Sequence, residues 1–376
     1  MHLADAPEAG PGEVRHGFAI DQASGAIATV NGVACLTCSG ASYFDAALVE
    51  QHRVGLDLEG SGALAIGGDT TFVLDRDFGE NPETHGGESR PPHYQLFALS
   101  NTDRELWRRD LGAGGPWAGF LAPDVLAGPA SVVVHGEPVA AVFDPVTGAP
   151  RWSTPVGFGT ALAADATGGL LVATGAHTTG PVAPEVTLRH FDSEGSATWT
   201  TTWGPATPPT FGDIIFDGAA RTADGGFLVT GEFTTATLDL GGPILPGVTG
   251  LHDGFPPHVN FIAAIDAQGA TRWAYTLGGA DANGYVQRLK VAASRDVAVV
   301  CGEYAGKDQL GLPDTFAGIA AFVARVDASG AITAYSIHGG GELSCEGLAA
   351  AGDGSAIVTV GSGPDYSSLF ETHGVT

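Results

Sequence analysis

Short apolar runs rich in β-branched residues alternate with turns of glycine and aspartate along most of this chain. One unit, Arg221 to Phe233, reads RTADGGFLVTGEF, and related units cover 163–175, 291–304, 348–361 and, more weakly, 56–68. The apolar run after each turn is nearly continuous, which is typical of a strand buried on both faces. Each unit therefore predicts a β-hairpin inside a sheet.

A second hairpin follows each of these units and ends on an aromatic residue. Residues 261–273 read FIAAIDAQGATRW, and similar stretches lie at 139–152, 187–199, 322–335 and, more loosely, 96–107. The Asp can accept hydrogen bonds from the turn backbone, and the Gly supplies a positive φ angle. The spacing from turn glycine to tryptophan is constant in three copies, namely Gly148/Trp152, Gly195/Trp199 and Gly269/Trp273. We expect each Trp ring to cover the gap between neighbouring sheets.

Two hairpins in series form a four-stranded antiparallel sheet, and their recurrence predicts an all-β fold, a β-propeller in which each sheet is one blade. We expect one propeller domain over residues 1–376, with 1–16 as a flexible N-terminal arm. The expected blades are 54–112, 126–157, 160–204, 216–279 and 287–340, with 345–376 as an inner hairpin and 17–53 as further strands.

The number of blades depends on residues 18–30, FAIDQASGAIATV. As an outer hairpin, this segment would complete the C-terminal blade and give six blades. As an inner hairpin, it would begin a separate blade and give seven, the number that we favour. In both cases the N- and C-terminal strands close the ring.

These motifs resemble known repeats. The D-x-x-G-x-x-x-W hairpins and the ADGGFLVTGEF strand are similar to the SBBP (seven-bladed β-propeller) repeats of bacterial surface and secreted proteins, and residues 143–152, FDPVTGAPRW, resemble the PQQ-type propeller repeat. The resemblance covers most of residues 54–362 and implies export to the periplasm or the cell exterior. It implies no single activity, because such repeats occur in adhesive, scaffolding and enzymatic proteins. Quinone-dependent propeller dehydrogenases typically carry adjacent cysteines, which this sequence lacks.

The chain is strongly acidic, with 16 basic and 42 acidic residues and a net charge of −26. The negative electrostatic field of this charge repels nucleic acid and anionic membranes. No apolar run reaches the length of a membrane-spanning helix. Cations or partners with basic patches are favoured, although the charge also serves solubility. The N-terminus lacks the features of a signal peptide, so the protein is either cytosolic or has lost an export signal. We expect a monomer or a module of a larger chain.

Long connections are expected on one face of the ring, where the second strand of a blade leads to the third and the fourth leads to the next blade. They occur at about 70–94, 234–260 and 304–321, whereas the one at Glu137-Pro138 is tight. Long loops on a rigid scaffold commonly carry binding function. Two of them contain Pro-Pro-His, which gives the ligand-binding candidates His85, His93, His252, Asp253 and His258. Such side chains could ligate a transition metal, but their spacing matches no established zinc motif, and duplication of one ancestral loop would produce the same likeness.

Three carboxylates form a second candidate group. Glu232 and Glu303 end the second strands of two blades, and Asp69 follows Gly67-Gly68 at what we expect to be a similar place. In a ring, equivalent positions lie at similar heights, so the three could form a partial ring that holds Ca²⁺ or a basic ligand. The alternative is that they are solvated loop acids. No other cofactor is indicated.

The four cysteines fall into two pairs. Cys301 ends the second strand of one blade and Cys345 enters the first strand of the next on the same face, so a disulfide could join the two blades in an oxidising compartment. Thioredoxin-like redox chemistry is not expected at Cys35 and Cys38, because no βαβ pattern surrounds them. These two cysteines form either a local disulfide or two free thiols.

The leading functional hypothesis is a non-catalytic, exported or cell-surface propeller that binds a protein or glycan through its long-loop face. The alternative is a hydrolase or lyase with carboxylates and histidines at the axial mouth, assisted by Ca²⁺. A purely structural module is a third interpretation. Convergence of Glu232, Glu303 and His258 with perturbed pKa values would favour the enzyme.

Overall fold

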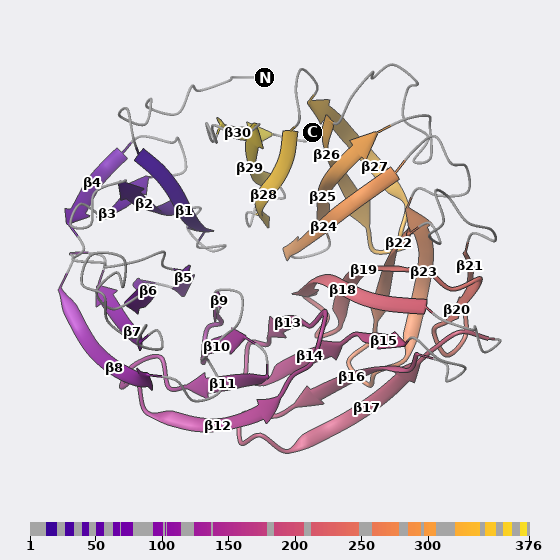
Figure 1. Ribbon diagram of the computed structural model, residues 1–376, viewed down its shortest axis with the longest axis horizontal. Helices are drawn as coiled ribbons and strands as arrows, with labels where there is room; N and C mark the ends of the chain where they lie inside the picture. The colour runs from indigo at the N-terminus through magenta and orange to yellow at the C-terminus, as the bar shows by residue number, and fades with distance from the viewer. Residues whose placement is uncertain are drawn as a thin grey trace, which may run out of the picture.

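Every regular element in the described part of the chain is a β-strand (Figure 1). Among these residues no helix is long and apolar enough to cross a membrane. The computed structural model describes residues 13–20, 27–33, 40–44, 50–55, 63–67, 69–77, 93–100, 102, 104–113, 124–136, 138–178, 184–206, 212–247, 258–277, 285–294, 297–305, 320–338, 343–350, 356–362 and 369–373.

The strands form seven antiparallel sheets of three to five strands and one separate two-stranded ribbon. The first three sheets are β1 (Glu13–Ile20), β2 (Ile27–Val33), β3 (Gly40–Phe44) and β4 (Glu50–Gly55); β5 (Ala63–Gly67), β6 (Thr70–Asp77), β7 (His93–Ser100) and β8 (Glu105–Ala113); and β9 (Asp124–Ala127), β10 (Val132–Gly136), β11 (Val139–Phe143) and β12 (Pro150–Pro155).

The fourth sheet contains β13 (Ala161–Ala164), β14 (Leu170–Thr174), β16 (Val186–Phe191) and β17 (Ala197–Trp203). The fifth contains β15 (Ala176–Thr178), β18 (Gly212–Arg221), β19 (Phe227–Phe233), β22 (Val259–Ile265) and β23 (Thr271–Leu277), and the ribbon is β20 (Thr237–Asp239) with β21 (Ile244–Pro246). The last two sheets are β24 (Tyr285–Ser294), β25 (Val297–Ala305), β26 (Ala320–Asp327) and β27 (Ile332–His338), and β28 (Leu343–Ala350), β29 (Ala356–Ser362) and β30 (Leu369–His373).

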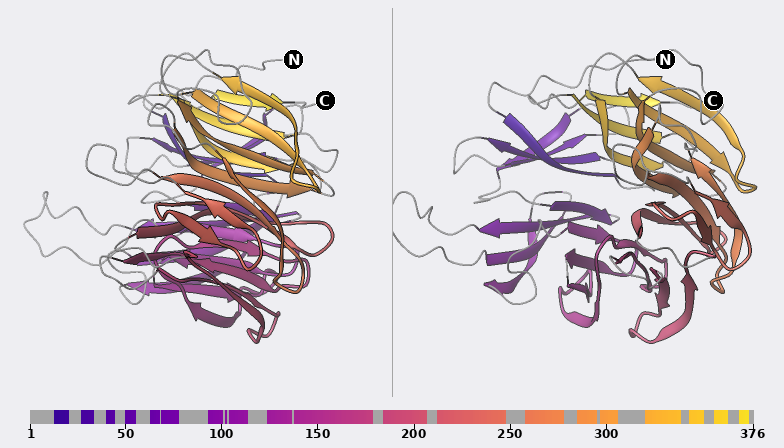
Figure 2. Two further views of the ribbon diagram at one scale, coloured as in Figure 1. Left: turned by 90° about the vertical axis from the view of Figure 1, so that its right-hand side faces the viewer. Right: turned by 45° about the vertical axis from the view of Figure 1, so that its right-hand side comes forward.

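The sheets succeed one another around a common centre, as a propeller requires (Figures 1 and 2). The first strand of each four-stranded sheet lies toward the centre and the last toward the periphery. Of residues 18–30, residues 18–20 lie in β1 and 27–30 in β2, and these two strands begin a sheet of their own, as the inner-hairpin interpretation expects. Two expectations need correction. Residues 13–16 belong to β1 and not to an arm, and the C-terminal sheet has a third strand, β30, beyond the expected hairpin.

A contact between tryptophan and glycine joins successive sheets. The outer-strand residues Trp107, Trp152, Trp199 and Trp273 each lie against the turn glycine of the next sheet, respectively Gly148, Gly195, Gly269 and Gly330. A Cβ atom on any of these glycines would lie between 2.5 and 2.9 Å from a tryptophan ring atom, and all four have positive φ angles. The turn therefore needs glycine both for its backbone conformation and for the approach of the ring.

Hydrogen bonds fix the same contact. The indole Nε1–H of Trp152 donates to the carbonyl oxygen of Ser193 (3.0 Å), and Trp107 and Trp273 donate similarly to Pro145 and Ala328. The turn itself is held by its aspartate. In one copy Asp192 Oδ1 accepts from the backbone N–H groups of residues 194 (3.0 Å) and 196 (2.8 Å). The Asp-Gly turn and the tryptophan thus cover the gap between sheets, as the sequence predicts.

Most of the core lies between neighbouring sheets. All seven residues of β22 are buried, which explains the continuous apolar run in its sequence. The β20–β21 ribbon extends this core. Its residues Leu238, Leu240 and Leu245 are buried in the same cluster as Trp203 of β17 and Phe233 of β19. The described part of the connection from β19 to β22, residues 234–247, therefore packs on the fourth and fifth sheets.

We expect Trp152→Ala to lower the free energy of unfolding by about 2 kcal/mol, because it removes a half-buried ring and its hydrogen bond to Ser193. Urea denaturation followed by circular dichroism measures the change. The control is Val146→Ala, at an exposed position of the turn, which should change stability by less than about 0.5 kcal/mol. Equal effects of the two substitutions would show that the tryptophan contact does not hold the sheets together.

Candidate functional site

The connections from second to third strands lie on one face of the molecule, because strand direction alternates within each sheet. The connections between sheets lie on the same face, called here the loop face. The expected long connections are present between β6 and β7 (78–92), β19 and β22 (234–258) and β25 and β26 (306–319), and the turn between β10 and β11 is tight.

An unexpected element lies on this face. Strand β15 follows β14 of the fourth sheet but pairs with the free edge of β18 in the fifth. The segment before β13 packs there as well, because the carbonyl oxygen of Gly159 accepts from the N–H groups of Gly175 (3.2 Å) and Phe216 (3.1 Å). Three chain segments are therefore held together by backbone hydrogen bonds.

Two histidine–carboxylate pairs lie at this junction. His177 of β15 is opposite Asp213 of β18, and its Nδ1 contacts the Asp213 carboxylate. His258, directly before β22, places its Nδ1 3.0 Å from Oε1 of Glu232 in β19. The second pair joins a residue of each sequence-predicted group, the Pro-Pro-His loops and the strand-end carboxylates.

The Glu232 carboxylate raises the pKa of His258 above its usual value, chiefly through the hydrogen bond between the two side chains. Burial acts in the opposite direction, while the negative charges of Asp213 and Asp217 add to the increase. The two pairs are thus coupled electrostatically, and a protonated His258 is favoured by three carboxylates.

Asp217 is the fifth member of this group, called here the loop-face cluster (His177, Asp213, Asp217, Glu232 and His258). It lies at a β-bulge in β18, where the pairing with β19 shifts between Phe216 and Gly218. Its side chain is open to solvent, yet protein occupies most of the surrounding volume. This partial loss of solvent and the adjacent charge of Glu232 raise the pKa of Asp217 to about 7, although a backbone hydrogen bond from Leu289 opposes the change.

The cluster can act chemically in two ways. Its carboxylates can bind a positively charged group, and a carboxyl group with a pKa of about 7 beside an imidazole can accept or donate protons at neutral pH. Within the described ranges, no three His, Cys, Asp or Glu side chains are grouped so as to hold a metal ion. An exposed ring adjoins the cluster, since Phe158 lies with its centroid 6.4 Å from that of His177.

The other predicted site residues lie elsewhere. His93 begins β7, as His258 precedes β22, but its Nε2 lies 2.9 Å from Oδ1 of Asp110 on the outer strand β8. The two Pro-Pro-His motifs therefore direct their histidines to different strands. Glu303 occupies in β25 the register position of Glu232 in β19, one sheet further along, and is buried. His85, His252, Asp253, Cys35 and Cys38 lie outside the described residues.

The placement of Asp69 at the end of a second strand is wrong. Asp69 lies in the turn between β5 and β6, on the face opposite the loop face. Asp75 takes the equivalent position instead, because its pairing with Gln95 matches that of Glu232 with Asn260. The error arose because the hairpin begins at Ala63, so that Gly67 ends the first strand of the sheet and not the second.

Sequence reasoning missed three members of the cluster. Asp217-Gly218 had a usable signal, because the pairs His16-Gly17 and Glu346-Gly347 also stand at bulges in first strands. A charged residue before glycine in an otherwise apolar first strand could have marked these bulges. His177 and Asp213 had no such signal, since their contact depends on β15 pairing with another sheet.

No family model matches the chain, and no curated protein is significantly similar to it in sequence. Several solved structures align with most of its length. They include BamB from Moraxella catarrhalis (16% identity, 93% of this chain and 85% of that one, TM-score 0.41). Hsv2 from Kluyveromyces lactis is 8% identical and has a TM-score of 0.46, with 96% of this chain and 98% of that one covered. The quinohemoprotein alcohol dehydrogenase from Comamonas testosteroni is 9% identical and has a TM-score of 0.43, with 93% of this chain and 66% of that one covered. Likeness at this level says nothing of function.

We expect Asp217→Asn to raise the melting temperature at pH 8 but not near pH 3.5. The pKa of Asp217 is higher in the folded protein than in the unfolded chain, so the folded form binds more protons between about pH 4 and 7. Stability is therefore lost as the pH rises through this range, and removing the carboxyl group restores it. Thermal unfolding of both proteins at the two pH values measures the effect.

Asp224→Asn is the matched comparison on the opposite face. Hydrogen bonds from Thr222 and then Arg272 lower the pKa of Asp224, so its stabilising contribution is present at neutral pH and the substitution should destabilise at pH 8. If Asp217→Asn also lowers the melting temperature at pH 8, the ionised carboxylate of Asp217 does not destabilise the folded protein, and the expected effect of its burial and of Glu232 is wrong.

Proposed function

We propose that this chain is a seven-bladed β-propeller that acts as an exported or cell-surface binding module. Residues 1–376 form one domain in this proposal, and the ring closes between the first and last sheets. Seven sheets surround the common centre, and β1 contacts β28, which supports closure at that point. The PQQ- and SBBP-like repeats agree with this architecture.

Export is supported by the cysteines. A disulfide joins Cys301 to Cys345, the pair suggested by the sequence. Structural disulfides form and persist in oxidising compartments such as the periplasm and the cell exterior. A buried disulfide between two sheets is therefore expected of a protein that folds outside the cytosol.

The loop-face cluster is the observation that carries the binding role. Its residues come from three strands and one loop that different parts of the chain contribute. Burial and then the charge of Glu232 raise the pKa of Asp217, so the ionised carboxylate of Asp217 is disfavoured in the folded protein and does not serve stability. A bound cationic group would favour the ionised carboxylate and would stabilise the folded state.

A basic side chain of a protein partner fits this chemistry. The guanidinium group of arginine can pair with Glu232 or Asp213, and its planar face or alkyl chain can pack on the exposed ring of Phe158. The net charge of −26 would in addition attract a basic partner over longer distances. A glycan lacks the positive charge that the cluster favours, so we propose a protein partner.

The test measures the affinity of a fluorescently labelled arginine-rich peptide by anisotropy, with an acidic peptide as a negative control. We expect Glu232→Gln to weaken binding about tenfold, because a charge-assisted hydrogen bond is lost. Glu194→Gln removes the same charge from an exposed turn on the opposite face and should leave the affinity unchanged. Equal affinities of wild type and both variants would refute binding at the cluster, and retention on a glycan array would favour a sugar ligand.

A second candidate function rests on the protonation state of the cluster. Asp217, with a pKa of about 7, could act as a general acid beside the His258–Glu232 pair, as in a hydrolase or lyase. A panel of chromogenic glycosides and uronate polymers tests this function. Turnover that Asp217→Asn abolishes and Glu194→Gln retains would establish an enzyme, whereas an inactive protein that binds the peptide would establish the binding module.

A further inference from the structure

The junction between the sixth and seventh sheets differs from four of the earlier junctions. The β24–β27 sheet lacks the outer-strand tryptophan of those junctions, and the aromatic residue of its outer strand is Tyr335. Tyr335 is 42% exposed, and in the described part of the chain no turn glycine packs against it as the four glycines pack against the tryptophans. Tyr335 therefore does not make the ring-on-glycine contact that joins the sheets at the four earlier junctions.

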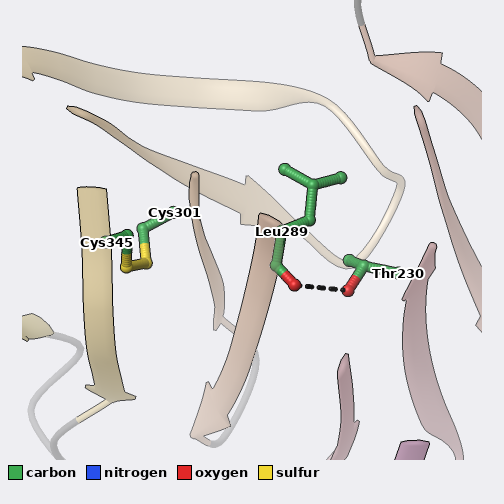
Figure 3. The surroundings of a disulfide bond; sticks show 4 residues. All are labelled: Thr230, Leu289, Cys301 and Cys345. Carbon is green, nitrogen blue, oxygen red and sulfur yellow. Dashed lines mark hydrogen bonds between the residues drawn. A yellow bond between two sulfur atoms is a disulfide. The ribbon is translucent and has the colours of Figure 1, made fainter. Parts of the chain in front are cut away.

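A covalent bond joins the two sheets instead. Figure 3 shows the disulfide between Cys301 of β25 and Cys345 of β28. Both cysteines are buried, with 0% and 3% exposure, in an apolar cluster that includes Val299, Val323 and Val358. The bond therefore lies inside the packing between the sheets and not on their surface.

The preceding junction has a non-covalent bond at the equivalent position. Thr230 of β19 corresponds to Cys301 of β25, because their pairings with Ile262 and Val323 match in register. The Thr230 hydroxyl donates to the carbonyl oxygen of Leu289 in β24 (3.3 Å), as Figure 3 also shows. The same second-strand position thus contacts the first strand of the next sheet in both places, through a hydrogen bond in one and a disulfide in the other.

We propose that the Cys301–Cys345 disulfide is a redox-sensitive lock on the terminal sheet. While the bond is intact, the β28–β30 sheet is tied to β25 through Cys345, and β28 also contacts β1. Reduction by a dithiol breaks the S–S bond and leaves two thiols, while the dithiol transfers two electrons and two protons and becomes a disulfide. The terminal sheet then separates from its neighbour more readily than any other sheet, and the ring, whose closure rests on the proposed function, opens there.

Burial of the two sulfur atoms gives this lock a kinetic property. A reductant reaches the disulfide only after the junction between β25 and β28 opens. At high concentrations of reductant, the rate of reduction should therefore become independent of that concentration, because opening becomes rate-limiting. A surface disulfide would instead be reduced at a rate proportional to the reductant.

Hydrogen exchange of the oxidised and the dithiothreitol-reduced protein tests the proposal. We expect amides of β28–β30 to exchange at least about tenfold faster after reduction, while those of β13, β14, β16 and β17 keep their rates. The melting temperature should fall by about 5 °C, because a loop-closing bond is lost. Equal acceleration in all sheets, no acceleration, or reduction without saturation would overturn the proposal.

Two variants separate the lock from other effects. Cys35→Ala/Cys38→Ala retains only the Cys301–Cys345 pair, so its response to reduction must match that of the wild type. Cys301→Ala/Cys345→Ala should show the fast exchange of β28–β30 without reductant, and adding reductant should not accelerate these strands further. If the second variant does not fold, the comparison of the first variant with and without reductant still decides the question.

Discussion

The architecture depends on the contact between a tryptophan ring and the glycine of the next sheet's turn. Antiparallel sheets of this size twist, and a ring of them holds together only if each sheet meets the next at a constant angle. The flat ring of Trp152, lying on a backbone without a side chain at Gly195, sets that approach. The indole hydrogen bond to Ser193 then fixes the position along the turn.

Because one local motif contains this contact, much of the fold could be predicted from the sequence. The Asp-x-x-Gly-x-x-x-Trp pattern includes a turn and the tryptophan whose ring packs on the turn of the next sheet, so each copy locates a sheet and its neighbour. The predicted strand boundaries were wrong where the strand pairing could not be read from the local sequence pattern. The sequence Gly67-Gly68-Asp69 suits either the end of a strand or a turn, and only the pairing of β5 with β6 decides between them. Strand β15 has three residues, and its partner β18 lies in another sheet.

The candidate site was predictable only in part, for the same physical reason. Glu232 has an equivalent in another repeat, Glu303, and the Pro-Pro-His motif of His258 recurs at His93. The contact between Glu232 and His258 then follows from the register of β19 and β22. His177 and Asp213 meet only because a connection from one sheet adds to the next. The pKa of Asp217 depends on a bulge and on the surrounding protein, which no single segment of sequence reveals.

The β20–β21 ribbon has a consequence for how the loop face can diversify. This ribbon belongs to a connection of the kind that usually tolerates replacement, yet Asp239 exchanges backbone hydrogen bonds with Gly204 of the neighbouring sheet, and Leu238 and Leu240 are buried. A foreign loop grafted in its place would uncover Trp203 and the interior beside it. Mutational drift in this stretch is thus restrained by the scaffold, and new specificities would arise from other connections on the same face.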